Sequence, residues 1–342
     1  MSTTQQRRPT MRDVAERAGV SFKTVSRVVN DEGGVRDDLV ASVWRSVEEL
    51  GYRRDDRARR LRQAGSRTGT IGFVLVDVAN PFFSTLLRGI EEVARDADYL
   101  VFAGSSDGLP ERENQLVEAF VARRVDGLIV VASGPGLGSL GAEIERGTPV
   151  VFLDLEPGGL TGDLVRSDHH GGAALATRHL QAHGHRDIAY FGDDPAVDSA
   201  GLRLTGYRDA MREAGMAIDE SRIVHGRHTP EVWRNILTDY LARPHPPTAL
   251  FTAQNFITIG ATQALHKLEL HSTIAQVGFD DIALADVVQP GISVVPQHPL
   301  DLGRRAAKLL FTRIAGSIGP PVRDIVAASM IARGSGEIPP HR

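Results

Sequence analysis

From residue 70 onward, short apolar runs rich in β-branched residues alternate with longer stretches in which apolar residues recur every three or four positions. The runs have the length of strands and the stretches have the period of helices. Alternation at this spacing predicts βαβ units with parallel sheets, and there is enough of it for two doubly wound lobes. We expect strands at 71–76, 99–103, 127–131, 150–153, 188–192, 249–253 and 275–279, and helices at 82–97, 111–123, 171–183, 201–214 and 256–268.

Before residue 52 the apolar positions have a helical period only. Thr10 and Asp13 form a capping-box pattern, and Gly19 is suited to the left-handed turn that closes a short helix. Ser21 can cap a second helix over about residues 22–30. Two short helices across a glycine turn predict a helix-turn-helix, whose second helix can enter the major groove of DNA.

A third helix is expected at 37–50, ended by Gly51. The residues that we expect to face the core of this headpiece are Val14, Ala15, Ala18, Val25, Val28, Val29, Leu39, Val40, Val43, Trp44 and Val47. On the second helix we expect Phe22, Lys23, Ser26 and Arg27 to be exposed.

The net charge of −4 hides an uneven distribution. Residues 1–67 hold 15 Lys and Arg against 10 Asp and Glu, and the rest of the chain holds 24 against 33. A basic head on an acidic body indicates an anionic partner for the head alone. A chain of 342 residues is also too long for one ordinary core.

Several classes of protein are disfavoured by composition. The chain has no cysteine, which excludes disulfides, thiolate metal sites and cysteine nucleophiles. Its 12 histidines are scattered, and it has no dinucleotide-binding, Walker A or nucleophile-elbow string. No stretch approaches the ~20 apolar residues of a membrane span, and the N-terminus lacks a secretory pattern. We therefore expect a cytoplasmic protein that is no enzyme, with no cofactor, metal or membrane partner.

Three segments of the headpiece, 13–15, 18–21 and 24–30, form one long ordered string that resembles the LacI/GalR repressors. The resemblance implies that Phe22, Lys23 and Arg27 reach base edges. It also implies that small polar residues position the helix on the DNA backbone, here Ser21, Thr24, Ser26 and Asn30. Lysine and arginine suit guanine, whereas Phe22 could read only by apolar contact, for instance with a thymine methyl group. The alternative is that Phe22 packs inside the headpiece.

Residues 52–62 hold six arginines in eleven positions, with Ala58 and Leu61 on one helical face. The resemblance implies a hinge helix in the minor groove, where a leucine pair from two subunits opens a base step; Leu61 matches that leucine and Ala58 the small residue beside it. Arg54-Asp55 replaces the usual Pro-Asn, so we expect a less pre-organised hinge. The alternative is a flexible charged linker. The predicted division is a headpiece at 1–52, a hinge and linker at 53–69 and a core at 70–342.

Five further strings, at 80–83, 124–129, 184–186, 278–281 and 333–336, extend the resemblance over nearly the whole chain. It implies the fold of periplasmic sugar-binding proteins, with two lobes, three crossings between them and an effector in the cleft. The predicted fold class is α/β: an all-α helix-turn-helix headpiece followed by a two-lobed core with parallel sheets.

The resemblance assigns a ligand-binding arginine to Arg203 and a hydroxyl-accepting acid to Asp280. Asp154 and Gln297 match other cleft positions, and aromatic rings (Phe82, Phe83 and His228) would form an apolar wall. An arginine fork with carboxylates suits vicinal hydroxyls, and aromatic faces suit the C–H surface of a sugar. The full predicted effector set is Asp77, Asn80, Phe82, Phe83, Asp154, Arg203, Gln254, Asp280 and Gln297.

Each assignment has a structural alternative: Asp280 as a surface turn residue, Arg203 in a structural ion pair, and Phe82 or Phe83 in the core. The chain also departs from the family at two places. Gln254-Asn255 stands where Asn-Asp is common, and His169 stands where Asn is usual. We therefore expect a ligand pose that differs from that of the better-known sugar repressors.

These features predict a sequence-specific transcriptional regulator, a repressor, that binds palindromic operator DNA as a homodimer and responds to a sugar or sugar derivative. A nucleobase or nucleoside is the alternative effector. A secreted sugar-transport protein would share the core, but it would need a signal peptide and would lack residues 10–62. No leucine heptads follow the core, so we expect a dimer and not a tetramer.

Overall fold

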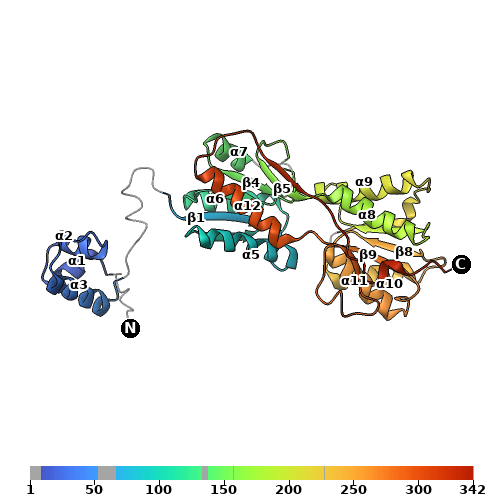
Figure 1. Cartoon of the computed structure of the whole chain (residues 1–342), viewed down its shortest axis with the longest axis horizontal. Helices are drawn as coiled ribbons and strands as arrows, with labels where there is room; N and C mark the ends of the chain where they lie inside the picture. The colour runs from blue at the N-terminus through green and yellow to red at the C-terminus, as the bar shows by residue number, and fades with distance from the viewer. Residues whose placement is uncertain (1–8, 53–66, 133–137, 157, 227, 342) are drawn as a thin grey trace. The chain divides into compact units, whose positions relative to one another are not determined.

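The computed structural model describes residues 9–52, 67–132, 138–156, 158–226 and 228–341. The chain divides into two compact units, Met1–Thr68 and Gly69–Arg342 (Figure 1). The predicted hinge positions Ala58 and Leu61 lie outside the described residues, so the hinge stays a prediction.

The headpiece consists of helices α1 (Met11–Ala18), α2 (Phe22–Val29) and α3 (Asp37–Leu50). Thr10 caps α1, since its side chain accepts from the Asp13 amide while the Asp13 carboxylate accepts from the Thr10 amide at 2.6 Å. Gly19 has a φ of 66°, and its N–H closes the helix on the carbonyls of Ala15 and Glu16. The predicted capping box and left-handed turn are therefore confirmed.

The headpiece core matches the prediction except at Trp44 and at Leu39, which is partly buried and is not part of the core cluster. Its fully buried apolar residues are Val14, Ala15, Val25, Val28, Val29 and Val43. The prediction for Trp44 was wrong, because this side chain is 46% exposed. The inward stripe of α3 runs through Val43, Ser46 and Leu50, at the helical spacing of three and four, and Trp44 lies beside it. Ser46 can be buried because its hydroxyl donates to the Ser42 carbonyl at 2.9 Å.

The first lobe of the core contains a six-stranded sheet in the order β11-β5-β4-β3-β1-β2, with every pair parallel. Its strands are β1 (Thr70–Leu75), β2 (Leu100–Ser105), β3 (Leu128–Val130), β4 (Val150–Leu153), β5 (Asp163–Ser167) and β11 (Arg323–Val326). Its helices are α5 (Pro81–Asp96), α6 (Pro110–Ala122), α7 (Gly138–Glu145) and α12 (Pro299–Ile314).

The second lobe contains a five-stranded parallel sheet in the order β10-β9-β8-β6-β7. Ile188 and Tyr190 of β6 pack with α8 and α9, whereas Ala189 and Phe191 pack with α10 and α11, so helices cover both faces. Its strands are β6 (Ile188–Gly192), β7 (Ile223–His225), β8 (Ala249–Thr252), β9 (Ala275–Phe279) and β10 (Ser293–Val295). Its helices are α8 (His169–Ala182), α9 (Asp198–Glu213), α10 (Pro230–Leu241), α11 (Asn255–Lys267) and the short 3₁₀ turns η1 (Glu220–Arg222) and η2 (Ser335–Glu337).

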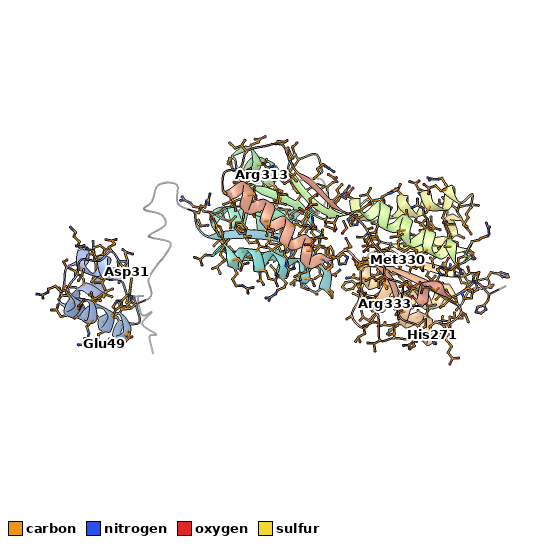
Figure 2. The ribbon with its side chains drawn as sticks, in the orientation of Figure 1. Asp31, Glu49, His271, Arg313, Met330 and Arg333 are labelled. Carbon is orange, nitrogen blue, oxygen red and sulfur yellow. The ribbon has the colours of Figure 1, made fainter. Side chains whose placement is uncertain are left out.

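The chain passes between the lobes three times, as expected. It crosses at residue 168 between β5 and α8, at 296–298 between β10 and α12, and at 327–330 between β11 and a bridge of Ile331 to Val294. Beyond the third crossing lies Arg333, which is labelled in Figure 2. Both of its terminal nitrogens donate to the Asp281 carboxylate, at 2.7 and 2.8 Å. Segments far apart in sequence therefore meet at the boundary between the lobes.

Every strand and helix that the pattern predicts is present, with ends within about three residues of the expected ones. The elements that the prediction missed are α7, α10, α12, β5, β7, β10 and β11. Most of them lie in the stretches that carry the chain between the lobes or close a sheet edge.

Helices α5 and α12 pack closely because glycines lie at their contact. A Cβ atom on Gly303 would collide with the backbone carbonyl of Leu86, and one on Gly89 with that of Leu300. This packing fixes the two helices against each other. The start of α5 carries Asn80 to Phe83 and the start of α12 follows Gln297, so the glycine contact positions two parts of the predicted effector site.

Gly303→Ala should force α5 and α12 apart and lower the free energy of unfolding by about 1–3 kcal/mol. Gly138→Ala is the matched control, because a Cβ there has no heavy atom within 4 Å. Urea unfolding of both variants checks this; equal stabilities would mean that the helices accommodate the methyl group and that the contact is not tight.

Candidate functional site

The second helix of the headpiece presents a mixed apolar and basic end to solvent. Ser21 caps α2 by accepting from the Thr24 amide at 3.1 Å, and the two hydroxyls lie 2.8 Å apart. Phe22 is 46% exposed and Lys23 is also exposed. Phe22 therefore projects from the headpiece and does not pack inside it.

The next turn of α2 holds the remaining predicted DNA contacts. The Asn30 amide donates to the Ser26 hydroxyl at 3.1 Å. The Arg27 guanidinium lies so close to Gly34 that a Cβ there would collide with it. These three side chains are partly buried and already have protein contacts, whereas Phe22 and Lys23 are the freest to reach a base edge.

In the core, the carboxyl ends of both parallel sheets contribute acids to the boundary between the lobes. Asp154 follows β4 directly, and Asp280 follows β9. Both are buried and both have left-handed backbones, with φ of 68° and 72°. Non-glycine residues adopt this conformation at a cost, and such strain concentrates at functional sites.

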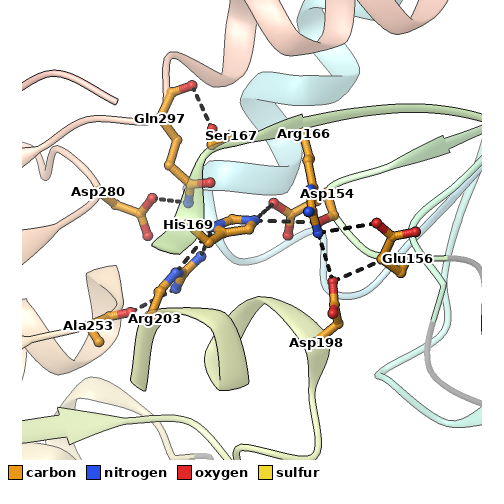
Figure 3. Close-up of polar contacts among 10 residues, drawn as sticks. All are labelled: Asp154, Glu156, Arg166, Ser167, His169, Asp198, Arg203, Ala253, Asp280 and Gln297. Atoms are coloured by element: carbon orange, nitrogen blue, oxygen red, sulfur yellow. Dashed lines mark hydrogen bonds and ion pairs between the residues drawn. The ribbon is translucent and has the colours of Figure 1, made fainter. Parts of the chain in front are cut away.

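Arg203 lies in a buried chain of contacts that reaches Asp154 (Figure 3). Its Nη1 donates to the Ala253 carbonyl at 2.7 Å, and its guanidinium lies 4.3 Å from the centre of the Phe279 ring. Its Nη2 and Nε lie 3.3 and 3.4 Å from His169 Nδ1. The other ring nitrogen of His169, Nε2, is 3.1 Å from Asp154 Oδ1.

Asp280 is fixed by two donors and is no surface turn residue. The Gln297 side-chain amide donates to its Oδ1, and the Asn255 backbone N–H donates to its Oδ2 at 3.2 Å (Figure 3). The Gln297 Oε1 atom is buried and has no hydrogen-bond partner among the described residues. A buried acceptor without a donor is costly unless a ligand or water supplies one.

Asn80 and Asn255 join the lobes through a reciprocal pair of amides. Asn255 Nδ2 donates to Asn80 Oδ1 at 2.7 Å, and Asn80 Nδ2 faces Asn255 Oδ1 at 3.3 Å. Each side chain also accepts from a backbone N–H at the start of its helix, that of Phe82 or Phe256. The pair therefore ties the beginning of α5 to the beginning of α11.

A second contact between the lobes is ionic. Arg166 on β5 lies 3.2 Å from Asp198 on α9 and 3.4 Å from Glu156 (Figure 3). Arg323 also pairs with Glu156, so together with Asp154 and Asp280 these residues put four carboxylates and three guanidinium groups, of Arg166, Arg203 and Arg323, at the boundary. Acidic groups therefore outnumber basic ones there.

A cavity of about 190 Å³ opens beside Asp280. Its walls come from the start of α5, the second crossing and the ends of β8 and β9. They are formed by Pro81, Phe82, Thr85, Asn255, Asp280, Asp281, Pro296, Gln297, His298, Pro299 and Ile331. Phe82 serves two roles, since it lines the cavity and also belongs to the core of the first lobe.

The predicted effector residues thus fall into three groups. Phe82, Asp280 and Gln297 line the cavity, and Asn80 lies beside it through Asn255. Asp154 and Arg203 are joined to each other by His169. The remaining ones make local contacts: Asp77 accepts from the Ala79 amide, Gln254 caps α11, and Phe83 packs edge-on against Phe82 at 5.1 Å.

Two residues in this network were not among the predicted site residues. His169 and Asn255 were noted only as departures from the family, and that was the one available signal for them. His228, expected in an apolar wall, packs against Trp233 at 5.3 Å and does not line the cavity. No group of three or more described histidines and acids has an arrangement that could hold a metal ion.

The two buried acids have opposite pKa shifts. Burial raises the pKa of Asp280, and the attraction of Arg203 and the Gln297 hydrogen bond offset only part of this. Burial alone would also raise the pKa of Asp154, but the nearby Nε2–H of His169 and the positive charges of Arg203 and Arg166 together lower it. Asp154 is therefore the acid that is held as a carboxylate.

Comparison with known proteins gives a consistent result. Residues 10–55 match the model for bacterial regulatory proteins of the lacI family, and residues 177–336 match a periplasmic binding protein-like domain. The ribose operon repressor of Escherichia coli (strain K12) is 33% identical over 329 residues, which cover 95% of this chain and 99% of the relative.

Two other proteins match over most of their length. The HTH-type transcriptional repressor PurR of Histophilus somni (strain 2336) is 30% identical, with 90% of this chain and 92% of the relative covered. The structure of the transcriptional regulator CelR in complex with cellobiose has a TM-score of 0.71 and 27% identity, with 96% of this chain and all of the other covered. In the described part of the chain, no helix has the length and apolar character needed to cross a membrane.

Asp154→Asn should remove the stabilisation that comes from its lowered pKa. That stabilisation is present above the unfolded-state pKa of about 3.9 and is lost as the pH falls through the folded value. The variant should therefore be less stable than the parent by about 1.5–3 kcal/mol at pH 7, and the difference should shrink in acid. Denaturant unfolding at several pH values measures this. Exposed Asp239→Asn is the control, and a difference that does not depend on pH would argue against an ionised Asp154.

Proposed function

The chain belongs to the LacI family of bacterial regulatory proteins, so it is a DNA-binding transcriptional repressor with an effector-binding core, and we propose that its effector is a small uncharged sugar. It is not an enzyme; the relatives named above are transcriptional repressors. The observation that carries the proposal is the set of polar groups around Asp280, beside a cavity with one aromatic wall.

Hydrogen-bond chemistry supports a sugar. The Asp280 carboxylate accepts from ligand hydroxyls, and the unpartnered Gln297 Oε1 accepts from another. Arg203 supplies donors, and the Phe82 ring offers an apolar surface to ring C–H groups. The ribose operon repressor is one relative with a sugar in its name, and the CelR structure contains cellobiose.

The charges at the boundary between the lobes favour an uncharged sugar over a sugar phosphate. Asp154, Glu156, Asp198 and Asp280 bring four acids to the boundary, against three arginines, Arg166, Arg203 and Arg323. A phosphate or carboxylate ligand would lie among like charges, whereas a neutral ligand would avoid that repulsion. The modest cavity of about 190 Å³ also favours a monosaccharide over a larger ligand.

A nucleobase or nucleoside is the second candidate. Phe82 could stack on a base while Asp280 and Gln297 bind its polar edge, and these groups line one cavity. We rank it below a sugar because the Arg203 fork and the carboxylates suit vicinal hydroxyls better than a planar heterocycle.

The mode of DNA binding follows the family. A homodimer would place two headpieces on an inverted repeat, with Phe22 and Lys23 at base edges and Ser21 and Thr24 at phosphates. Ala58 and Leu61 would enter the minor groove between them. The effector would alter the relation of the lobes and so the operator affinity, a coupling of typically ~1–3 kcal/mol. Such a regulator would act in the cytoplasm, where its DNA target is.

A thermal-shift screen of the full chain against pentoses, hexoses, sugar phosphates, nucleobases and nucleosides tests the effector. A neutral sugar at 100-fold above its Kd should add about 2.7 kcal/mol of stability. Arg203→Lys should lose most of this response because lysine cannot reproduce the planar fork. Arg208→Lys, on the same helix but paired with Glu220, is the control. Shifts with phosphates or nucleobases alone would exclude the sugar.

Lys23→Ala should weaken operator binding by about 1–3 kcal/mol if Lys23 reads a base edge. The duplex is first selected from a random pool with the unaltered protein, and binding is then measured by fluorescence anisotropy. Lys308→Ala removes an exposed charge from α12 and serves as the control. The assignment is wrong if both variants lose the same affinity, or if Lys23→Ala weakens unrelated duplexes as much as the selected one.

A further inference from the structure

His169 lies between two predicted effector-binding residues, Asp154 of the first lobe and Arg203 of the second. It is the first residue of α8, directly after the first crossing, and is only 1% exposed. Its ring lies 6.0 Å from the Phe279 ring, and the Arg203 guanidinium also lies against the Phe279 ring. One ring nitrogen faces Arg203 of the second lobe, and the other faces Asp154 of the first (Figure 3).

The donors around the ring fix where its proton lies. A guanidinium can only donate, so Nδ1, at 3.3 and 3.4 Å from two Arg203 nitrogens, has to accept. The single proton of the neutral ring is then on Nε2. This atom lies 3.1 Å from Asp154 Oδ1 and 3.4 Å from the Asp154 carbonyl oxygen, and both are acceptors.

We propose that His169 is a positioning residue of the effector site, a neutral imidazole with its proton on Nε2 that holds Arg203 and Asp154 in register across the lobes. The proposal rests on the proposed function, since it concerns the same site. It names no new ligand contact. Its consequence is that the two side chains are oriented before the effector arrives, which reduces the ordering cost of binding.

His169 also limits what Arg203 can offer a ligand. The imidazole Nδ1 accepts from Arg203 Nε and Nη2, and the Ala253 carbonyl accepts from Arg203 Nη1. One N–H on each terminal nitrogen is left for a ligand. Two free donors suit a ligand with several hydroxyl oxygens.

Protonation of His169 would dismantle this arrangement. A proton on Nδ1 would face the N–H groups of Arg203 and place a second cation beside it. Asp154 faces the ring directly. Arg166 on β5 and Asp280 after β9 interact electrostatically with Asp154 and Arg203. None of these three side chains can replace Nδ1 of His169 as the acceptor for Arg203.

Nitrogen-15 NMR of the histidine-labelled full chain tests the protonation state without any effector. The His169 signals are identified by their loss in His169→Gln, and those of the partly buried His170, paired with Asp209, by their loss in His170→Gln. At neutral pH we expect an unprotonated Nδ1 and a protonated Nε2 at His169. Any other state, with Nδ1 protonated or with both nitrogens protonated, would overturn the proposal.

Calorimetry with D-ribose as the probe tests the positioning role. His169→Ala should weaken binding by about 10- to 100-fold, and His169→Gln, which keeps a donor and an acceptor, should restore part of it. His170→Gln, at the next position of the same helix, should keep the parental affinity.

The outcomes separate the two proposals. Variants that melt earlier yet keep the parental Kd would make His169 merely structural. If D-ribose and the other sugars do not bind the parent, the sugar proposal fails, and the NMR result still decides the role of His169.

Discussion

Two carboxylates, Asp154 and Asp280, are buried between the lobes of the core, and most of the surrounding polar structure serves to compensate them. Removing a charge from water is expensive unless partners replace the lost solvation. Asp280 has donors from elements distant in sequence, Gln297 of the second crossing and the Asn255 backbone, and Asp154 has the His169 ring 3.1 Å from its Oδ1. The segments that connect the lobes are thus the segments that satisfy the acids.

This arrangement links the site to the relation of the lobes. The Asn80–Asn255 amide pair and the Arg166–Asp198 ion pair both span the boundary. Asn255 also donates to Asp280, so a ligand that bonds to Asp280 acts on a group already engaged in an interlobe contact. A small change in hydrogen bonding at the acid can in this way favour one arrangement of the lobes over another, which is the differential interaction that allosteric control requires.

The departures from the family have a physical reason in the same network. An acid at position 255 would put a third carboxylate beside Asp280 and would have no donor for the Asn80 Oδ1 atom; asparagine supplies both a donor and an acceptor. Similarly, His169 can accept from Arg203 on one side and donate to Asp154 on the other. Both substitutions strengthen contacts within the protein at the place where an effector is expected.

The sequence by itself determined the features that depend on neighbouring residues. The Thr10–Asp13 capping box, the Gly19 turn and the strands at 150–153, 188–192 and 275–279 were predictable, because their hydrogen bonds or burial repeat within a few positions. The resemblance to the LacI/GalR family predicted that Asp154, Arg203, Asp280 and Gln297 belong to one cleft.

Only the tertiary structure decided which side chains satisfy one another. Trp44 has helical spacing that suits the core, yet the three-helix packing leaves it exposed. Asp77 and Gln254 fit the pattern of site residues but cap local backbone, whereas His169 and Asn255 complete contacts that span 34 and 175 positions. Periodicity carries information over one or two turns, and such long-range pairs exist only after the crossings bring the lobes together.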